Sequence, residues 1–209
     1  WDDVERAVTH EVSICYKLLR YANSPLLGLW SEIKSVRHAL ALLGQDEVSK
    51  LVTLAVALSL ASDKPPELMS TALVRARCCE LVGAALGPRA GRLSSVTCFL
   101  AGMFSVMDAL LGMRMDEILS QVALPAEVRG ALQGEPNVIR SVFELVSAYE
   151  AGNWRAVNEY SAKLQLNETL LPVIYFEALD WANHVFALSS PERVTSQKRG
   201  VPSQPSPAA

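Results

Sequence analysis

The sequence predicts an all-α protein, a compact multi-helix bundle of about nine or ten helices. Half of its 209 residues are hydrophobic, mostly Leu, Val and Ala, and only 7% are aromatic. Leu and Ala favour helices over strands, and apolar residues recur at the three- and four-residue spacing of amphipathic helices. No two alternating apolar segments are joined by an Asn-Gly turn, so no β-hairpin is expected.

The first helix is expected over residues 1–22. Its apolar stripe consists of Val4, Val8, Val12, Cys15, Leu18 and Leu19. The helix should end before Pro25, because proline disfavours helical geometry in the residue that precedes it. Asn23 tolerates the left-handed conformation of a helix cap and supports an end at this point.

Three more helices are expected in the next part of the chain. Ser31 can cap a helix that ends at Gly44, and Asp46 can cap a third helix over residues 46–61. The stretch SDKPPE at 62–67 offers capping side chains, prolines and an early acid, which is typical of a helix start. The helix that follows should reach Gly87.

A long apolar stretch follows, in which residues 93–107 carry no charge. A membrane span needs about 20 largely apolar residues, so this shorter stretch is predicted to be a central core helix. Asp108 interrupts it, and an unpaired buried carboxylate is costly. Asp108 is therefore expected to face solvent, to pair with Arg75 or Arg77, or to mark a ligand pocket.

The remaining chain predicts several shorter helices and a tail. Helices are expected at 115–122, 124–134, 136–150, 153–164 and 170–188. Glu144 and Glu150 lie six residues apart, do not share a helical face, and are interpreted as a solvated edge. Residues 189–209 contain closely spaced prolines and few large apolar side chains, so disorder is expected beyond Arg193.

Net charge and cysteine content narrow the range of possible partners and sites. The net charge of −3 gives no basic field for nucleic acid or an anionic membrane surface. The cysteines match no zinc-site spacing and are predicted to be buried, reduced thiols, as in a cytoplasmic protein; they are Cys15, Cys78, Cys79 and Cys98. The chain begins with Trp1 rather than Met and shows no signal peptide, so a preceding domain is expected.

Residues 16–44, YKLLRYANSPLLGLWSEIKSVRHALALLG, resemble the opening of HDOD domains, the HD-related output domains of bacterial signalling proteins. The matching pattern is a Leu-rich helix, an Asn-Ser turn, and then Ile33, Ala39-Leu40 and Leu43-Gly44. Later stretches also resemble this family, namely KPPELMSTALVRARCCELV, FLAGMFSVMDALLG, LPAEVRGALQG and AYEAGNW. The resemblance covers residues 1–188, with 189–209 as a tail, and is greatest to the branch in which HDOD follows an EAL domain, the cyclic-di-GMP phosphodiesterase module.

The resemblance also implies that the metal ligands of HD hydrolases have been lost. In metal-dependent HD hydrolases, the helix that matches FLAGMFSVMD carries a His-Asp pair that binds the metal. Here Ser105 and Val106 stand at those positions, and no histidine occupies residues 74–77, where another ligand is expected. The implied function is a non-catalytic regulatory or scaffolding domain, without metal or cofactor, that binds protein partners of a bacterial signalling pathway.

Two alternatives remain open. A metal-dependent phosphohydrolase of nucleotides or cyclic dinucleotides would need ligands from Asp108, Asp116 and Glu117 together with one of the histidines His10, His38 and His184. A non-hydrolytic nucleotide sensor would need Arg75 or Arg77 to hold a phosphate. The candidate ligand-binding or vestigial pocket therefore consists of Arg75, Arg77, Ser105 and Asp108, and a homodimer is left open.

Overall fold

A computed structural model of the protein describes residues 2–60, 64–87 and 93–189, and it is all-α. These residues form eleven α-helices and two short 3-10 helices and contain no strand, which confirms the predicted fold class. None of their helices combines the length and the hydropathy that crossing a membrane requires. The elements in order are α1 (Asp2–His10), α2 (Val12–Ala22), η1 (Pro25–Leu27), α3 (Val36–Leu60), α4 (Pro66–Leu86), α5 (Ser95–Phe104), α6 (Met107–Leu111), α7 (Met115–Gln121), α8 (Ala126–Leu132), α9 (Val138–Glu150), α10 (Trp154–Leu164), η3 (Glu168–Leu170) and α11 (Leu171–Ser189).

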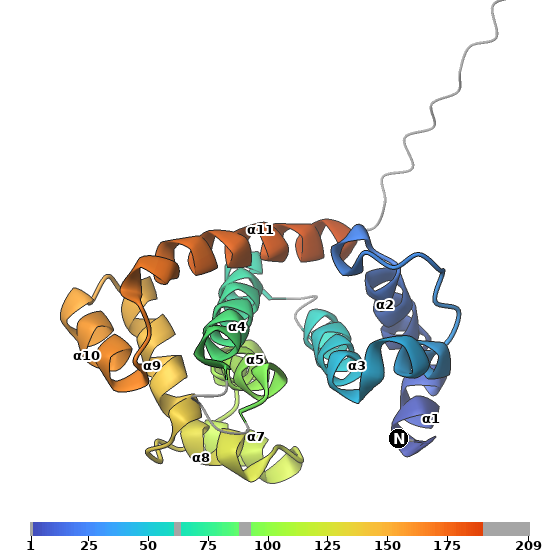
Figure 1. Ribbon diagram of the computed structural model, residues 1–209. Coiled ribbons are helices and arrows are strands. Elements are labelled where there is room, and N and C mark those ends of the chain that lie inside the picture. Colours follow the sequence, from blue (N-terminus) through green and yellow to red (C-terminus); the bar gives the residue numbers. More distant parts are fainter. Residues whose placement is uncertain (1, 61–63, 88–92, 190–209) are drawn as a thin grey trace, which may run out of the picture.

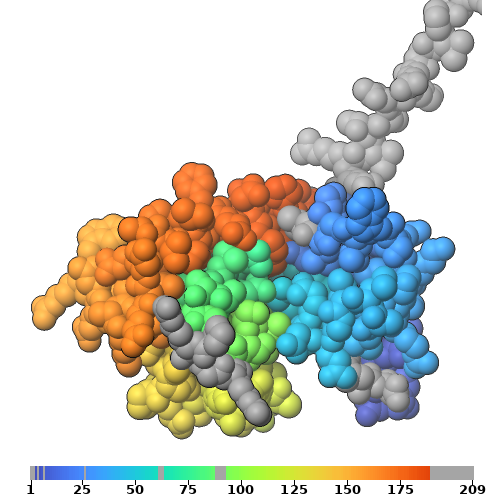
Figure 2. Space-filling model, in the orientation of Figure 1, coloured from blue at the N-terminus to red at the C-terminus, as the bar shows by residue number. Residues whose placement is uncertain are grey.

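Helices α4 and α5 occupy the middle of the molecule. Figure 1 shows α1, α2 and α3 on one side of this pair, α9 and α10 on the other, and α7 and α8 below it. The long helix α11 runs across the top and contacts both α4 and α2. In the space-filling view, the orange to red surface of α11 reaches the blue surface of the N-terminal helices (Figure 2).

The central pair packs backbone against backbone. A Cβ atom on Gly102 of α5 would lie 2.7 Å from Cα of Ala76 and 2.7 Å from the carbonyl oxygen of Arg75, so only glycine allows this approach. Phe99 and Met103 of α5 are fully buried. The apolar stretch is therefore a core helix, as its length predicted.

The predicted first helix is divided. Glu11 leaves the helical conformation with φ −91° and ψ 87°, so α1 and α2 are separate helices. The break keeps Val8 and Leu18 in the core but leaves Val12 77% exposed. Val12 therefore does not belong to the buried stripe that its spacing predicted.

The second helix begins later than predicted, at Val36 instead of Ser31. The side chain of Asn23 explains the delay, because its Oδ1 accepts the Ile33 N–H at 2.6 Å and its Nδ2 donates to the Ile33 carbonyl at 2.8 Å. These two bonds hold residue 33 in the loop while its side chain is buried. Gly44 has φ 80° and ψ 171°, so the predicted boundary is a kink inside α3.

The other predicted helices correspond to observed ones within a few residues. The helix predicted over residues 67–87 is α4 (Pro66–Leu86), and the stretches predicted from residue 115 onward form α7 to α11. The apolar stretch itself is interrupted, because Ser105 and Val106 separate α5 from α6. The predicted tail lies outside the described residues from position 190 onward.

Candidate functional site around the two arginines of α4

Two arginines lie on a helix that is otherwise largely buried. The side chains of Arg75 and Arg77 on α4 are 17% and 22% exposed. A guanidinium group cannot lose its proton in a protein, so each of these cations needs an anionic or hydrogen-bonding partner. Each arginine pairs with a glutamate from a helix distant in the sequence, and Arg77 also pairs with a glutamate of α4 itself.

Arg75 pairs with Glu150, the last residue of α9. Its Nε and Nη2 donate to the same oxygen, Oε2 of Glu150, at 2.9 and 2.6 Å. Its Nη1 donates to Oγ of Ser105 at 3.2 Å. The guanidinium carbon also lies 5.9 Å from the centre of the Phe143 ring. Arg75 therefore connects α4, the end of α5 and α9.

Ser105 stands at the break between α5 and α6. Its hydroxyl donates to the Gly102 carbonyl at 2.7 Å, and a serine that bonds to a carbonyl of its own helix competes with the regular backbone bonds. The structure thus brings together two predicted site residues, Arg75 and Ser105. Val106, beside Ser105, is buried in the core and offers no ligand atom.

Asp108 does not join this cluster. It is exposed at the start of α6, where its Oδ1 accepts the Ala109 N–H at 2.8 Å. Of the three expectations for this residue, exposure to solvent is the one observed. The other acids of the hydrolase alternative are also exposed, and Asp116 pairs with Arg114 at 3.0 Å.

Arg77 has a second set of partners. Its Nη1 donates to Oε2 of Glu80 at 2.8 Å, and its Nη2 donates to Oε1 of Glu177 on α11 at 2.8 Å. Burial alone would lower the pKa of Arg77, but the hydrogen bonds and charges of Glu80 and Glu177 outweigh it and raise the pKa. Arg77 therefore stays charged and holds α11 to α4.

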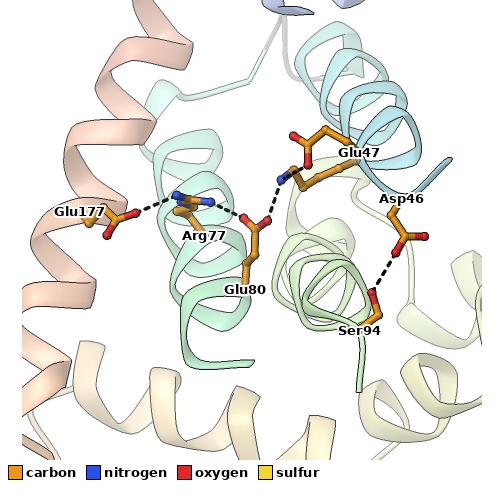
Figure 3. Close-up of polar contacts among 7 residues, drawn as sticks. Asp46, Glu47, Arg77, Glu80, Ser94 and Glu177 are labelled. Atoms are coloured by element: carbon orange, nitrogen blue, oxygen red, sulfur yellow. Dashed lines mark hydrogen bonds and ion pairs between the residues drawn. The ribbon is translucent and has the colours of Figure 1, made fainter. Parts of the chain in front are cut away.

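Glu80 extends this set to α3. Lys50 donates to Oε1 of Glu80 at 2.6 Å and also contacts Oε2 of Glu47 at 2.8 Å. The resulting series runs from Glu47 through Lys50, Glu80 and Arg77 to Glu177. Figure 3 shows it, with the side chain of Lys50 drawn without a label between Glu47 and Glu80. Lys50 and Glu80 are both almost fully buried. The series joins three helices that enclose the core.

The sequence patterns did not identify the partners of the two arginines, nor the buried Lys50. Lys50 and Glu80 lie among apolar neighbours in DEVSKLVTLAVAL and RCCELVG, and that placement was the available signal of buried charge. The interpretation of Glu150 as a solvated edge is wrong, because its side chain is only 15% exposed and is paired. Its partner lies 75 residues away, which no local pattern shows.

No metal-binding cluster is found in the described part of the chain, where no three side chains of His, Cys, Asp or Glu are placed to hold one ion. His184 lies with Nδ1 2.8 Å from the Asp180 carbonyl on its own helix. All four thiols are free; Cys78, Cys79 and Cys98 are buried, as predicted, whereas Cys15 is only half-buried. Burial raises the pKa of Cys78 and of Cys98 to about 12 and also raises that of Cys79, so these thiols are poor nucleophiles at neutral pH.

Comparison with known proteins supplies the family. The sequence pattern of the HDOD domain matches residues 1–144. The chain is 33% identical over 182 residues to the cyclic di-GMP phosphodiesterase CdgJ of Vibrio cholerae, covering 87% of this chain and 41% of that protein. It is 30% identical over 185 residues to the uncharacterized protein YuxH of Bacillus subtilis, covering 87% of this chain and 44% of that protein. The chain thus spans less than half the length of these relatives, and no solved structure matches it.

Proposed function

This chain belongs to the HDOD domain family of signalling proteins, and on that premise we propose that it is a non-catalytic regulatory domain that acts by binding other proteins. The observation that carries the proposal is the Arg75–Ser105–Glu150 cluster. It lies where the resemblance places the metal-binding pair of HD hydrolases.

Within the cluster, the positive charge of Arg75 is balanced by the negative charge of Glu150. The cation at this place is the Arg75 guanidinium, and the carboxylate of Glu150 neutralises it at 2.6 Å. Ser105 accepts one more N–H of the guanidinium and donates its own hydrogen to Gly102. An arrangement in which each charged group already has a partner suits a structural role better than the activation of a water molecule.

The same argument bears on the nucleotide-sensor alternative. A phosphate site needs guanidinium groups that face a cavity. Arg75 and Arg77 instead bind Glu150, Glu80 and Glu177, so a phosphate would have to displace a carboxylate from either arginine. A protein-binding role requires no such rearrangement.

The surface of α11 supports interaction with a protein. Four large apolar side chains at the start of this helix are exposed between 37% and 78%, namely Leu170 of the preceding η3 and Val173, Phe176 and Leu179 of α11. Exposed apolar residues that gather on one helix are typical of binding surfaces rather than of an inert surface. The partners we propose are proteins of a bacterial signalling pathway, with an EAL-type domain first because one relative is named a cyclic di-GMP phosphodiesterase.

The absence of catalysis is tested by metal loading. The 209-residue chain, purified without tag or chelator, is incubated with Fe²⁺, Mn²⁺ or Zn²⁺, passed over a desalting column and analysed for metal. The same samples are assayed for hydrolysis of cyclic di-GMP and of nucleotides. We expect metal far below one equivalent and no hydrolysis, whereas stoichiometric metal with turnover would overturn the proposal.

The binding role is tested by a two-hybrid assay against EAL-type and receiver domains. We expect an interaction that Phe176→Glu removes, because a charge in an apolar contact is costly. Asn183→Glu adds the same charge at an exposed position of the same helix and should leave the interaction intact. Failure to bind either class of domain would count against a protein-binding function.

A further inference from the structure

A cleft opens between the N-terminal helices and the short helices that follow α5. One wall is the second half of α3, and the other is built from the end of α5 with α6 and α7; Figure 1 shows α3 beside α5 and α7 below it. The volume of the cleft is about 220 Å³. The lining residues are Val52, Thr53, Val56, Ala57, Leu60, Phe104, Met107, Leu111, Ile118 and Val122.

Only one of the lining side chains is polar. Thr53 is the sole lining side chain with a hydroxyl, and its Oγ1 already donates to the Ser49 carbonyl at 2.9 Å. A charged or strongly polar ligand would lose its hydration here without gaining partners. The cleft therefore selects an uncharged apolar group and rejects a nucleotide phosphate.

The size of the cleft suits a small molecule. Three of its lining residues, Ala57 of α3, Met107 of α6 and Ile118 of α7, are buried, while Leu60 is 46% exposed. An apolar cavity of about 150 Å³ is large enough to bind benzene in another protein. Drug-sized ligands occupy about 300 Å³ or more, so this cleft fits a single aromatic ring or a short alkyl chain.

We propose that this cleft is a binding site for a small, uncharged, apolar molecule of that size. Such a ligand contacts α3 on one side and α6–α7 on the other, so its binding strengthens the contact between the N-terminal helices and the rest of the domain. The driving force is removal of apolar surface from water, at about 25 cal/mol per Å². The proposal does not depend on the proposed function, because neither the ion-paired cluster nor α11 lines the cleft.

Methionine provides a direct readout. The chain has five methionines, and Met107 is the one that lines the cleft. The 209-residue chain, labelled with ¹³C at the methionine ε-methyl groups, is titrated with benzene and followed by NMR. We expect a saturable shift of the Met107 signal, with the buried Met69 and the half-buried Met113 and Met115 much less affected.

Variants that fill the cleft complete the test. Val56→Phe and Val122→Phe place a ring into it from opposite walls, so either one should weaken benzene binding at least tenfold, and the pair guards against one variant failing to fold. Thr53→Val removes the hydroxyl and should leave binding unchanged or tighter. Val173→Phe, on the exposed face of α11, is the matched control and should bind as the wild type does.

The outcomes separate clearly. A saturable Met107 shift that both cleft-filling variants abolish supports the site. A Met107 signal that does not move up to the solubility limit of benzene overturns it, as does an equal shift of all methionines. Binding that survives both cleft-filling variants, or that Thr53→Val abolishes, would also contradict an apolar site at this place.

Discussion

The ion pair between Arg75 and Glu150 stabilises the domain chiefly because either charge would be costly if it were buried without its partner. Their side chains are 17% and 15% exposed, and a carboxylate at that depth is costly without a cation. The pair joins α4 to α9 across 75 residues of sequence. An arginine within an apolar helix could be recognised from the sequence as needing a partner, whereas the identity of that partner depends on how the helices fold together.

Arg75→Ala is expected to lower the free energy of unfolding by about 3 kcal/mol, the lower end of the range for breaking a buried pair, since both groups retain some exposure. Urea unfolding followed by circular dichroism measures the loss. Arg114→Ala is the control, because Arg114 and its partner Asp116 are 78% and 71% exposed. That change should cost no more than about 0.5 kcal/mol, and equal costs for the two variants would refute the argument.

The buried thiols make stability depend on alkaline pH. Burial raises the pKa of Cys98 from 9.0 to about 12 in the folded chain, so the unfolded chain loses this proton first as the pH rises. Above about pH 9 the unfolded state therefore binds fewer protons, and the free energy of unfolding falls by up to about 1.4 kcal/mol per pH unit for this thiol.

Urea unfolding of the reduced chain at pH 8, 9 and 10, compared with Cys98→Ala, isolates the thiol from other groups that titrate in this range. The variant lacks the thiol, so its stability should decline less steeply with pH even if its stability at pH 8 is lower. Identical slopes for both proteins would show that Cys98 does not contribute to the pH dependence.

The points at which the helices start, end and break depend on individual side chains more than on apolar spacing. The spacing located nearly all the helices, but it did not predict the break at Glu11, the late start of α3 or the interruption at Ser105. The last two involve side-chain hydrogen bonds outside the regular helix pattern, from Asn23 to Ile33 and between Ser105 and Arg75. A periodic pattern cannot register such bonds, because it describes one segment at a time.

Gly102→Ala tests the crossing of α4 and α5. The added Cβ would meet backbone atoms of Arg75 and Ala76 at 2.7 Å, and backbone atoms cannot move aside without separating the helices. A loss of about 2–3 kcal/mol is expected by urea unfolding, despite the higher helix propensity of alanine.

Gly130→Ala, a glycine-to-alanine change inside α8, is the control for Gly102→Ala. A Cβ on Gly130 would meet the Glu135 carboxylate at 2.5 Å, but that group is the end of a flexible side chain and can rotate away. The control variant should be within about 1 kcal/mol of the wild type. A Gly102→Ala protein as stable as this control would mean that the two central helices are not in close backbone contact.

At the scale of the whole molecule, α11 connects parts of the domain that are otherwise joined mainly through α3. Trp181 of α11 is 9% exposed and packs edge-on against Tyr21 of α2 and Phe99 of α5, with ring centres 6.2 and 6.1 Å apart. Arg77 lies 5.9 Å from the same ring. The sequence predicted a last helix here, but its position across the bundle depends on contacts that span most of the chain.

Trp181→Ala is therefore expected to do more than lower stability by about 3–5 kcal/mol, the usual cost of removing a large buried aromatic side chain. It removes the contact that ties α2 to α5, so amide hydrogen exchange should accelerate more in α1–α3 than in α9, whose contacts with α4 and α10 remain. Phe176→Ala, on the same helix but 78% exposed, should leave both stability and the exchange pattern within about 0.5 kcal/mol of the wild type. If exchange in Trp181→Ala instead rose equally in α1–α3 and α9, the domain would unfold as one cooperative unit, and α11 would not be what holds the N-terminal helices in place.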